Sequence, residues 1–353
     1  MPEVRRNTGR KKRGDHIMCK FITSLMVPTG IQASVGGYLG DATPFANLIS
    51  SISDYTITHP NVVNGGVLNL MKENIVYTEG TLFDMFFRGE IELTPRKGNK
   101  IGVVVEKNND KGAMALLKNT INGLKADGGI NVIGVEMTEK LVDAEAHIKH
   151  GVAHGEIKDL TQLDKPIKKL IAKGADTIAL SVQITADHEL WEQYYEGKTP
   201  NPVGALEAVI SHHVVDKYRI PAAHAPLVHQ KDWKLNLKDR EVYWRAGTEA
   251  ISPAYLSCIL IGLSKAPKIT KKGKGEVSVD DVSALVVPYT ACGGIPVFEA
   301  MKRKIPIIAV KEIKTNLNVT PNSIGIDAIE VETLDEALGK LMEIREGIML
   351  ERD

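Results

Sequence analysis

The chain has 353 residues, of which 43% are hydrophobic and 25% are charged, so it can bury a core large enough for two domains. Its 44 basic and 44 acidic residues balance and its aromatic content is 5%, so we expect no nucleic-acid partner. We find no run of about 18 apolar residues and no apolar signal-peptide core, which argues against a membrane partner. Three widely spaced cysteines make no disulfide framework, so we expect a cytoplasmic protein.

The first part of the chain combines a charged arm with a short α/β segment. Residues 1–17 hold six Lys or Arg residues against two acidic ones, and we expect a basic, disordered arm there. Residues 18–98 form an N-terminal α/β segment that includes a Gly-rich loop. Its strands are expected over residues 19–28, 54–60 and 74–80, and its helices over residues 45–52 and 81–89.

A second unit begins at residue 99 and continues to residue 353. Strands are expected over residues 100–107, 131–137 and 175–184, and they alternate with helices over residues 112–126, 163–174 and 204–218. The apolar segment 252–267 also predicts a buried strand, and the chain closes with a helix over residues 333–350. This rhythm is typical of a Rossmann-like region. The whole chain therefore predicts an α/β fold of mainly parallel, doubly wound sheets in two lobes.

The Gly-rich loop "PTGIQASVGGYLGDATP" follows the first expected strand and precedes a helix. Backbone N–H groups near Gly36, Gly37 and Gly40, with Asp41 beside them, could approach a phosphate or carboxylate at the helix N-terminus. The loop lacks the glycine spacing of dinucleotide folds and the Lys-Ser/Thr ending of a P-loop. A tight structural turn is therefore the equal alternative.

Polar residues follow the next two expected strands. His59, Asn61 and Asn64 lie at the end of one strand, and Glu79 ends the next strand just before a helix. Ligands of open α/β sheets bind at the carboxyl ends of strands, so these residues predict a site if the two strands are parallel neighbours. The structural alternatives are a hydrogen-bonded loop histidine for His59 and a carboxylate stabilised by the helix dipole for Glu79.

The helix expected over residues 204–218 carries two adjacent histidines with different surroundings. The apolar spacing of its neighbours directs His213 to the core or its border, whereas Glu207 and His212 lie on another face. His224 follows in the next short strand. Convergence of His212, His224 and His59 with Glu207 or Glu79 would suit acid–base catalysis or a divalent metal. The three histidines of "AEAHIKHGVAHGE" are expected in a polar surface loop instead.

The loop "YTACGGIP" places Cys292 between a buried strand and a helix, where a thiolate is stabilised. Thr290, Gly293 and Gly294 would let a ligand approach the backbone there. This stretch of about 25 residues resembles the first cysteine loop of the aspartate/glutamate racemase superfamily, which implies proton abstraction by a thiolate without a cofactor. The sequence departs from that pattern at Gly293-Gly294, where the Asn-Thr pair is missing. Cys258, the other candidate thiol, is expected in the core, and simple packing is the alternative role for Cys292.

Six ordered blocks resemble a domain-of-unknown-function family of cyanobacteria, plastids and other prokaryotes. The blocks are "PTGIQASVGGYLGDATP", "THPNVVNGG", "YTEG", "GALEAVISHH", "AAHAP" and "TACGG". The resemblance runs from about Met18 to the C-terminus and leaves the basic arm outside. The family has an apolar residue at the position of His213, which leaves His212 as the functional candidate. The resemblance implies no reaction.

Together these patterns favour an enzyme that acts on a small anionic metabolite by cofactor-independent acid–base or nucleophilic chemistry of isomerase or lyase type. Cys292 would be the base or nucleophile and a histidine the proton partner, with Asn61 and Asn64 orienting the substrate. One alternative is a metal-dependent hydrolase or lyase that uses His59, His212, His224 and Glu79; a non-catalytic metabolite-binding protein is the other. No cofactor is favoured, a divalent metal belongs to the first alternative, and we expect a homo-oligomer.

Overall fold

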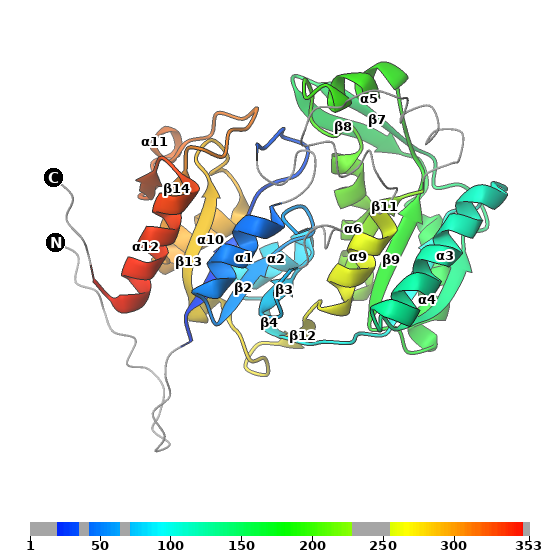
Figure 1. Ribbon diagram of the computed structural model, residues 1–353, viewed down its shortest axis with the longest axis horizontal. Coiled ribbons are helices and arrows are strands. Elements are labelled where there is room, and N and C mark those ends of the chain that lie inside the picture. The colour runs from blue at the N-terminus through cyan, green and yellow to red at the C-terminus, as the bar shows by residue number, and fades with distance from the viewer. Residues whose placement is uncertain (1–19, 35–41, 64–70, 228–254, 349–353) are drawn as a thin grey trace.

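A computed structural model describes residues 20–34, 42–63, 71–227 and 255–348. Within these residues the chain forms two parallel sheets side by side, each with helices on both faces (Figure 1). The predicted α/β class, with mainly parallel, doubly wound sheets in two lobes, is confirmed. None of the helices in these ranges combines the length and apolar character needed to span a membrane.

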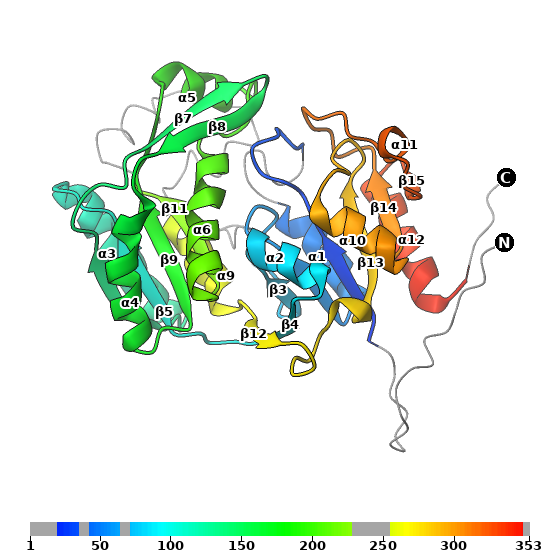
Figure 2. The same ribbon diagram turned by 180° about the vertical axis from the view of Figure 1, so that it is seen from behind.

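The first sheet has the strand order β15-β14-β13-β1-β2-β3, and all its neighbouring strands are parallel. Most residues of its four central strands are buried, as expected for a sheet covered on both faces. Helices α1 (Thr43–Ser51) and α12 (Leu334–Glu346) cover one face, and α2 (Gly80–Arg88) and α10 (Ile295–Arg303) cover the other (Figure 2). The strands are β1 (Ile22–Leu25), β2 (Tyr55–Thr58), β3 (Ile75–Tyr77), β13 (Val282–Pro288), β14 (Ile307–Val310) and β15 (Ile329–Val331).

The second sheet has the order β11-β9-β5-β6 and is also parallel throughout. Helices α4 (Asp164–Ala172) and α6 (Gly204–Tyr218) pack on one face, and α3 (Lys111–Asp127) and α9 (Tyr255–Ser264) on the other. Helix α6 also contacts α2, so it lies between the two lobes (Figure 2). The strands are β5 (Ile101–Val105), β6 (Val132–Met137), β9 (Thr177–Val182) and β11 (Ala222–Pro226).

The chain crosses between the two sheets twice. It leaves the first sheet through β4 (Ile91–Thr94) and returns through β12 (Lys268–Lys271), and these two strands pair antiparallel where the lobes join. Strands β13 to β15 belong to the first sheet although they lie in the region 99–353. The expected division at residue 98 therefore marks only the first of the two crossings.

A small sheet adds a hairpin to the second lobe. Strands β7 (Ala144–Lys149) and β8 (Val152–Ile157) pair antiparallel, and β10 (Ile184–Ala186) joins β7. The surface loop predicted for this segment is wrong, because small buried residues alternate with exposed polar ones and a left-handed His150-Gly151 turn closes the hairpin. The remaining short elements are α5 (His188–Tyr195), α11 (Pro321–Ile324) and 3-10 turns at Leu160–Leu163 and Val279–Asp281.

The segment around Cys258 is a helix, α9, and not the predicted strand. Its ten residues are nearly all apolar, and periodicity alone cannot separate a buried helix from a buried strand. Helix α9 packs between the second sheet and Tyr77 of β3, where a Cβ atom on Gly262 would lie 2.4 Å from the Tyr77 ring. The glycine therefore allows the helix and the ring to meet.

Candidate functional site

The polar residues predicted at the strand ends of the first sheet share one edge. Strands β2 and β3 are parallel neighbours, and Thr58 pairs with Tyr77. His59 therefore follows β2 directly beside the point where Glu79 follows β3. Both side chains are buried, at 8% and 2% exposure respectively.

Glu79 caps the N-terminus of α2. Its Oε2 atom accepts hydrogen bonds from the N–H groups of Thr81, at 2.7 Å, and Leu82, at 3.3 Å. This is the carboxylate at a helix N-terminus that the sequence offered as a structural role for Glu79. The cap uses only one carboxyl oxygen and leaves Oε1 for other partners.

Oε1 of Glu79 faces helix α6 of the other lobe, and Figure 2 shows α2 and α6 facing each other. Ser211 Oγ donates to this oxygen at 3.1 Å, and His212 Nε2 lies 3.2 Å from it. Gly80 makes the approach of the imidazole possible, because a Cβ atom there would lie 3.0 Å from His212 Nε2. Two consecutive residues of α6 thus meet a single carboxyl oxygen across the contact between the lobes.

Burial controls the protonation of this group. Loss of hydration raises the pKa of Glu79 to about 8, against the opposing effect of the Leu82 and Thr81 N–H groups and the Ser211 hydroxyl. Burial also lowers the pKa of His212, although 41% of its side chain remains exposed. A protonated Glu79 can therefore donate to neutral His212, and the imidazole connects the buried carboxyl group to solvent.

A second histidine–carboxylate pair joins Glu207 of α6 to His224 of β11. Glu207 Oε1 is 3.1 Å from His224 Nδ1, and the other ring nitrogen of His224 is close to the backbone of Val182, 3.3 Å from its N and 3.1 Å from its O. With Nδ1 as the donor to Glu207, the ring can accept from the Val182 N–H through Nε2. Glu207 and the Val182 backbone therefore hold the His224 ring in place from both of its nitrogens.

Tyr77 lies close enough to the carboxylates of both pairs to feel their charge, and it was not among the predicted site residues. It is fully buried, and its pKa is raised by burial and further by the charges of Cys258, Glu79 and Glu207. These acidic groups therefore lie within electrostatic range of its ring. The feature of the sequence that could have identified Tyr77 is its position two residues before Glu79 in "YTEG".

Glu106 is a second residue that sequence reasoning missed. It follows β5 at the carboxyl edge of the second sheet, and only 2% of it is exposed. Its carboxylate accepts hydrogen bonds from the N–H groups of Val142, at 2.5 Å, and Gln183, at 3.0 Å. Its position directly after the apolar run "KIGVVV" could have identified it from the sequence. In the structure its carboxylate connects two loops through their backbone N–H groups.

His59 and Asn61 both hold the backbone at Val27, directly after β1. The Val27 N–H donates to His59 Nε2 at 3.1 Å, and Asn61 Nδ2 donates to the Val27 carbonyl at 2.7 Å. The His59 ring packs edge-on against Phe83, and burial lowers its pKa to about 4. His59 is thus a neutral, hydrogen-bonded loop histidine, the structural alternative considered from the sequence.

Cys292 is fully buried, and its Sγ lies 3.5 Å from the carbonyl oxygens of Pro288 and Tyr289. Burial raises the pKa of this thiol to about 11, so at neutral pH it is a protonated thiol. The loop around Cys292 is held by a 2.8 Å hydrogen bond between the hydroxyls of Thr290 and Thr315 and by packing of Gly293 on Val319. Gly294 is the N-cap residue of α10. None of the described histidines contacts Cys292.

The predicted residues separate into two histidine–carboxylate pairs and a group whose side chains hydrogen-bond to the backbone. His212 pairs with Glu79 and His224 with Glu207, while His59 pairs with neither. Across the described ranges, no three His, Cys, Asp or Glu side chains are placed to hold a metal ion together. Five predicted ligand-binding residues lie outside these ranges: Gly36, Gly37, Gly40, Asp41 and Asn64.

The chain matches a known family over most of its length. A family model described as a protein of unknown function, DUF3326, matches residues 22–352. The chain belongs to the DUF3326 family. The match begins after the basic arm, as the sequence resemblance predicted.

A curated relative extends the comparison over nearly the whole chain. The chain is 32% identical over 330 residues to an uncharacterized lipoprotein of Synechococcus, a match that covers 92% of this chain and 90% of that protein. Neither comparison names a reaction, so the function has to be inferred from the histidine–carboxylate pairs described above.

Proposed function

We propose that this DUF3326 protein is an enzyme in which Glu79 moves a proton on a small anionic metabolite, in a reaction of isomerase or lyase type. The observation that carries the proposal is the buried Glu79 carboxyl group, with a pKa of about 8 and its Oε1 shared by Ser211 and His212. A group with a pKa near the working pH is the most effective acid–base catalyst. His212 would return or remove the proton at the solvent side.

The chemistry proposed for the substrate is abstraction of a proton next to a carboxylate. Glu79 in its ionised form would take the proton from carbon, and the C–H electron pair would move into the neighbouring carbonyl group to form an enolate. Return of a proton from the Glu79–His212 pair gives the isomer, and loss of a leaving group gives the lyase outcome.

The geometry favours the carboxylate–histidine pairs over the other candidate groups. Cys292 is protonated and turned to backbone carbonyls, so it is a poor base beside Glu79. A metal-dependent hydrolase would need His59, His212, His224 and Glu79 around one ion, whereas His59 and His224 already bind backbone groups of Val27 and Val182. No observation on the described residues favours that alternative.

Exchange of carbon-bound hydrogen tests the proposal without knowledge of the substrate. The protein would be incubated in D2O with a panel of small carboxylic acids and phosphate esters, and deuterium uptake would be measured by mass spectrometry. We expect uptake into at least one carboxylate, reduced by about 10²–10⁴-fold in Glu79→Gln. Glu106→Gln is the matched control, because it removes another buried carboxylate.

Three results would contradict the assignment. Uptake that survives Glu79→Gln but is lost in Cys292→Ala would return the base to the thiol. Equal losses in Glu79→Gln and Glu106→Gln would point to general damage of the fold. Saturable binding of a panel member without any deuterium uptake would favour the non-catalytic binding protein.

A further inference from the structure

The second sheet ends in an edge strand, β6, which no other strand of the described residues pairs with on its outer side. Thr138 donates its N–H to the Val105 carbonyl at 2.9 Å, so this residue faces the neighbouring strand β5. Because backbone groups alternate along a strand, the N–H and C=O groups of Val135 and Met137 face the open side. These groups are a template for a further strand.

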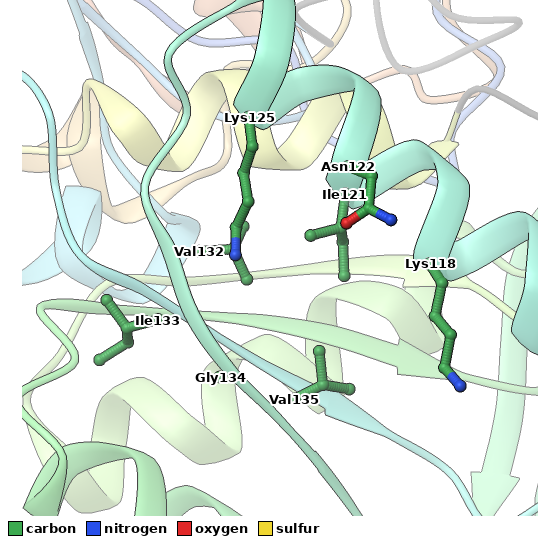
Figure 3. Close-up of a pocket in the computed structure, with 8 residues that line it drawn as sticks. All are labelled: Lys118, Ile121, Asn122, Lys125, Val132, Ile133, Gly134 and Val135. Atoms are coloured by element: carbon green, nitrogen blue, oxygen red, sulfur yellow. The ribbon is translucent and has the colours of Figure 1, made fainter.

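A groove runs between this edge and helix α3. It has a volume of about 270 Å³, and Ile121 and Val132 are the buried residues among those that line it. Figure 3 shows the side chains of Lys118 and Lys125 extending from α3 toward β6. The groove thus combines a buried apolar part, two cationic side chains and an open strand.

The charge on this side of β6 is unbalanced. Lys118 and Lys125 are exposed and form no ion pair with any residue that the structure describes. On the opposite side of the strand, Glu136 is bound by Lys173 at 2.6 Å and Lys169 at 3.4 Å, so its charge is compensated. The residues that line the groove therefore include two cationic side chains and no acidic one, next to a strand whose Val135 is 41% exposed.

We propose that the groove between α3 and β6 docks an extended acidic segment of a partner protein, added to the sheet as a strand beside β6. The backbone of the segment would bond to the open groups of Val135 and Met137, and alternate side chains would point toward α3. Acidic side chains at those positions would reach Lys118 and Lys125. A second copy of this chain fits less well, because a symmetric contact would bring the same lysines together. The proposal involves no residue of the Glu79 cluster.

The test uses the full-length protein and a short fluorescent peptide in which glutamate alternates with valine. Binding would be followed by fluorescence polarisation at low and high salt, and compared with the same peptide carrying lysine in place of glutamate. We expect only the acidic peptide to bind, more weakly at high salt, with a loss of at least about tenfold in a Lys118→Glu, Lys125→Glu double variant.

Val135→Pro separates strand addition from simple charge attraction. It removes an N–H group on the open side and leaves the ladder to β5, whereas Val135→Thr keeps that N–H and serves as the matched control. We expect Val135→Pro to abolish binding and Val135→Thr to retain it. If Val135→Pro fails to fold, hydrogen exchange on the wild-type protein decides, with protection of the Val135 and Met137 amides expected when the peptide binds.

Three outcomes would overturn the proposal. The first is equal binding of the acidic and basic peptides. The second is acidic binding that survives Val135→Pro or that leaves the Val135 and Met137 amides unprotected, which would mean attraction by the lysines alone. The third is a peptide-independent dimer that Val135→Pro dissociates, which would assign the edge to self-association.

Discussion

We expect this protein to lose stability as the pH rises, and replacing Glu79 with glutamine should remove most of that loss. The glutamine carbonyl can accept the Thr81 and Leu82 N–H groups in place of Oε2, and its NH2 group can donate to His212 Nε2. Glu79→Gln therefore imitates the protonated carboxyl group and cannot ionise. Its folded structure should match that of the wild-type protein at acidic pH.

The expected magnitude follows from the pKa of Glu79, which burial raises from 4.5 to about 8. The folded protein holds this proton between pH 4.5 and 8 while the unfolded chain has already released it. The free energy of unfolding therefore falls as the pH rises through this window. A difference of this size corresponds to up to roughly 5 kcal/mol, which Glu79→Gln should abolish.

The measurement is urea unfolding at a series of pH values from 4 to 9, followed by circular dichroism. The free energy of unfolding of Glu79→Gln minus that of the wild-type protein should grow steadily above pH 4.5 and level off above pH 8. Glu106→Gln should still lose stability as the pH rises, because Glu79 remains. Parallel curves for the wild-type protein and Glu79→Gln would refute the reasoning.

Three further predictions test the surroundings of the site. Burial lowers the pKa of His59 from 6.5 to about 4, so the free energy of unfolding should decrease by up to roughly 3 kcal/mol as the pH falls from 6.5 to 4. In urea unfolding, the stability of His59→Gln should depend less on pH in this range than that of the wild-type protein. Burial raises the pKa of Cys292 from 9 to about 11, so the folded protein holds about 100-fold less of its thiolate than the unfolded chain. A thiol reagent should therefore modify Cys292 at least about 100-fold more slowly in the folded protein, as followed by mass spectrometry. Rapid labelling of the folded protein would contradict the burial of this thiol. Gly262→Ala should cost roughly 1–3 kcal/mol in urea unfolding, because its Cβ would lie 2.4 Å from the Tyr77 ring, whereas Gly123→Ala in α3, with open space around it, should cost nothing.

The elements of the fold were predictable where an apolar pattern had a clear length and period. The runs around β5, β9 and β13 are short, apolar and followed by turns, and all three became parallel strands. The strand predicted for segment 252–267 was wrong because its apolar residues form no stripe that would distinguish a helix from a strand; residues 255–264 form α9, which packs on the second sheet and on Tyr77. Pairing between strands was beyond the sequence, since nothing local links β1 to β13.

The candidate site was predictable in its residue types but not in its partners. Strand-end positions identified Glu79 and His59, and helix spacing placed Glu207 and His212 on a face apart from the core. The partners depend on how α2 meets α6, which is a property of two lobes and not of either segment. Burial also changed what single groups can do, since it made the Cys292 thiol harder to ionise and the ionised Glu79 carboxylate a stronger base.

The return of the chain to its first sheet sets an order of assembly during synthesis. Ile22 of β1 pairs with Val282 of β13, so the middle of the first sheet cannot close until the ribosome has made most of the chain. The second sheet, by contrast, takes its four strands from residues 101–226 and can form earlier. The side of β1 that pairs with β13 must therefore stay open while the second sheet folds, and an open strand edge is a site for aggregation. A chain that stops before residue 282 would leave β1 without its partner β13, although β1, β2 and β3 could still pair with one another.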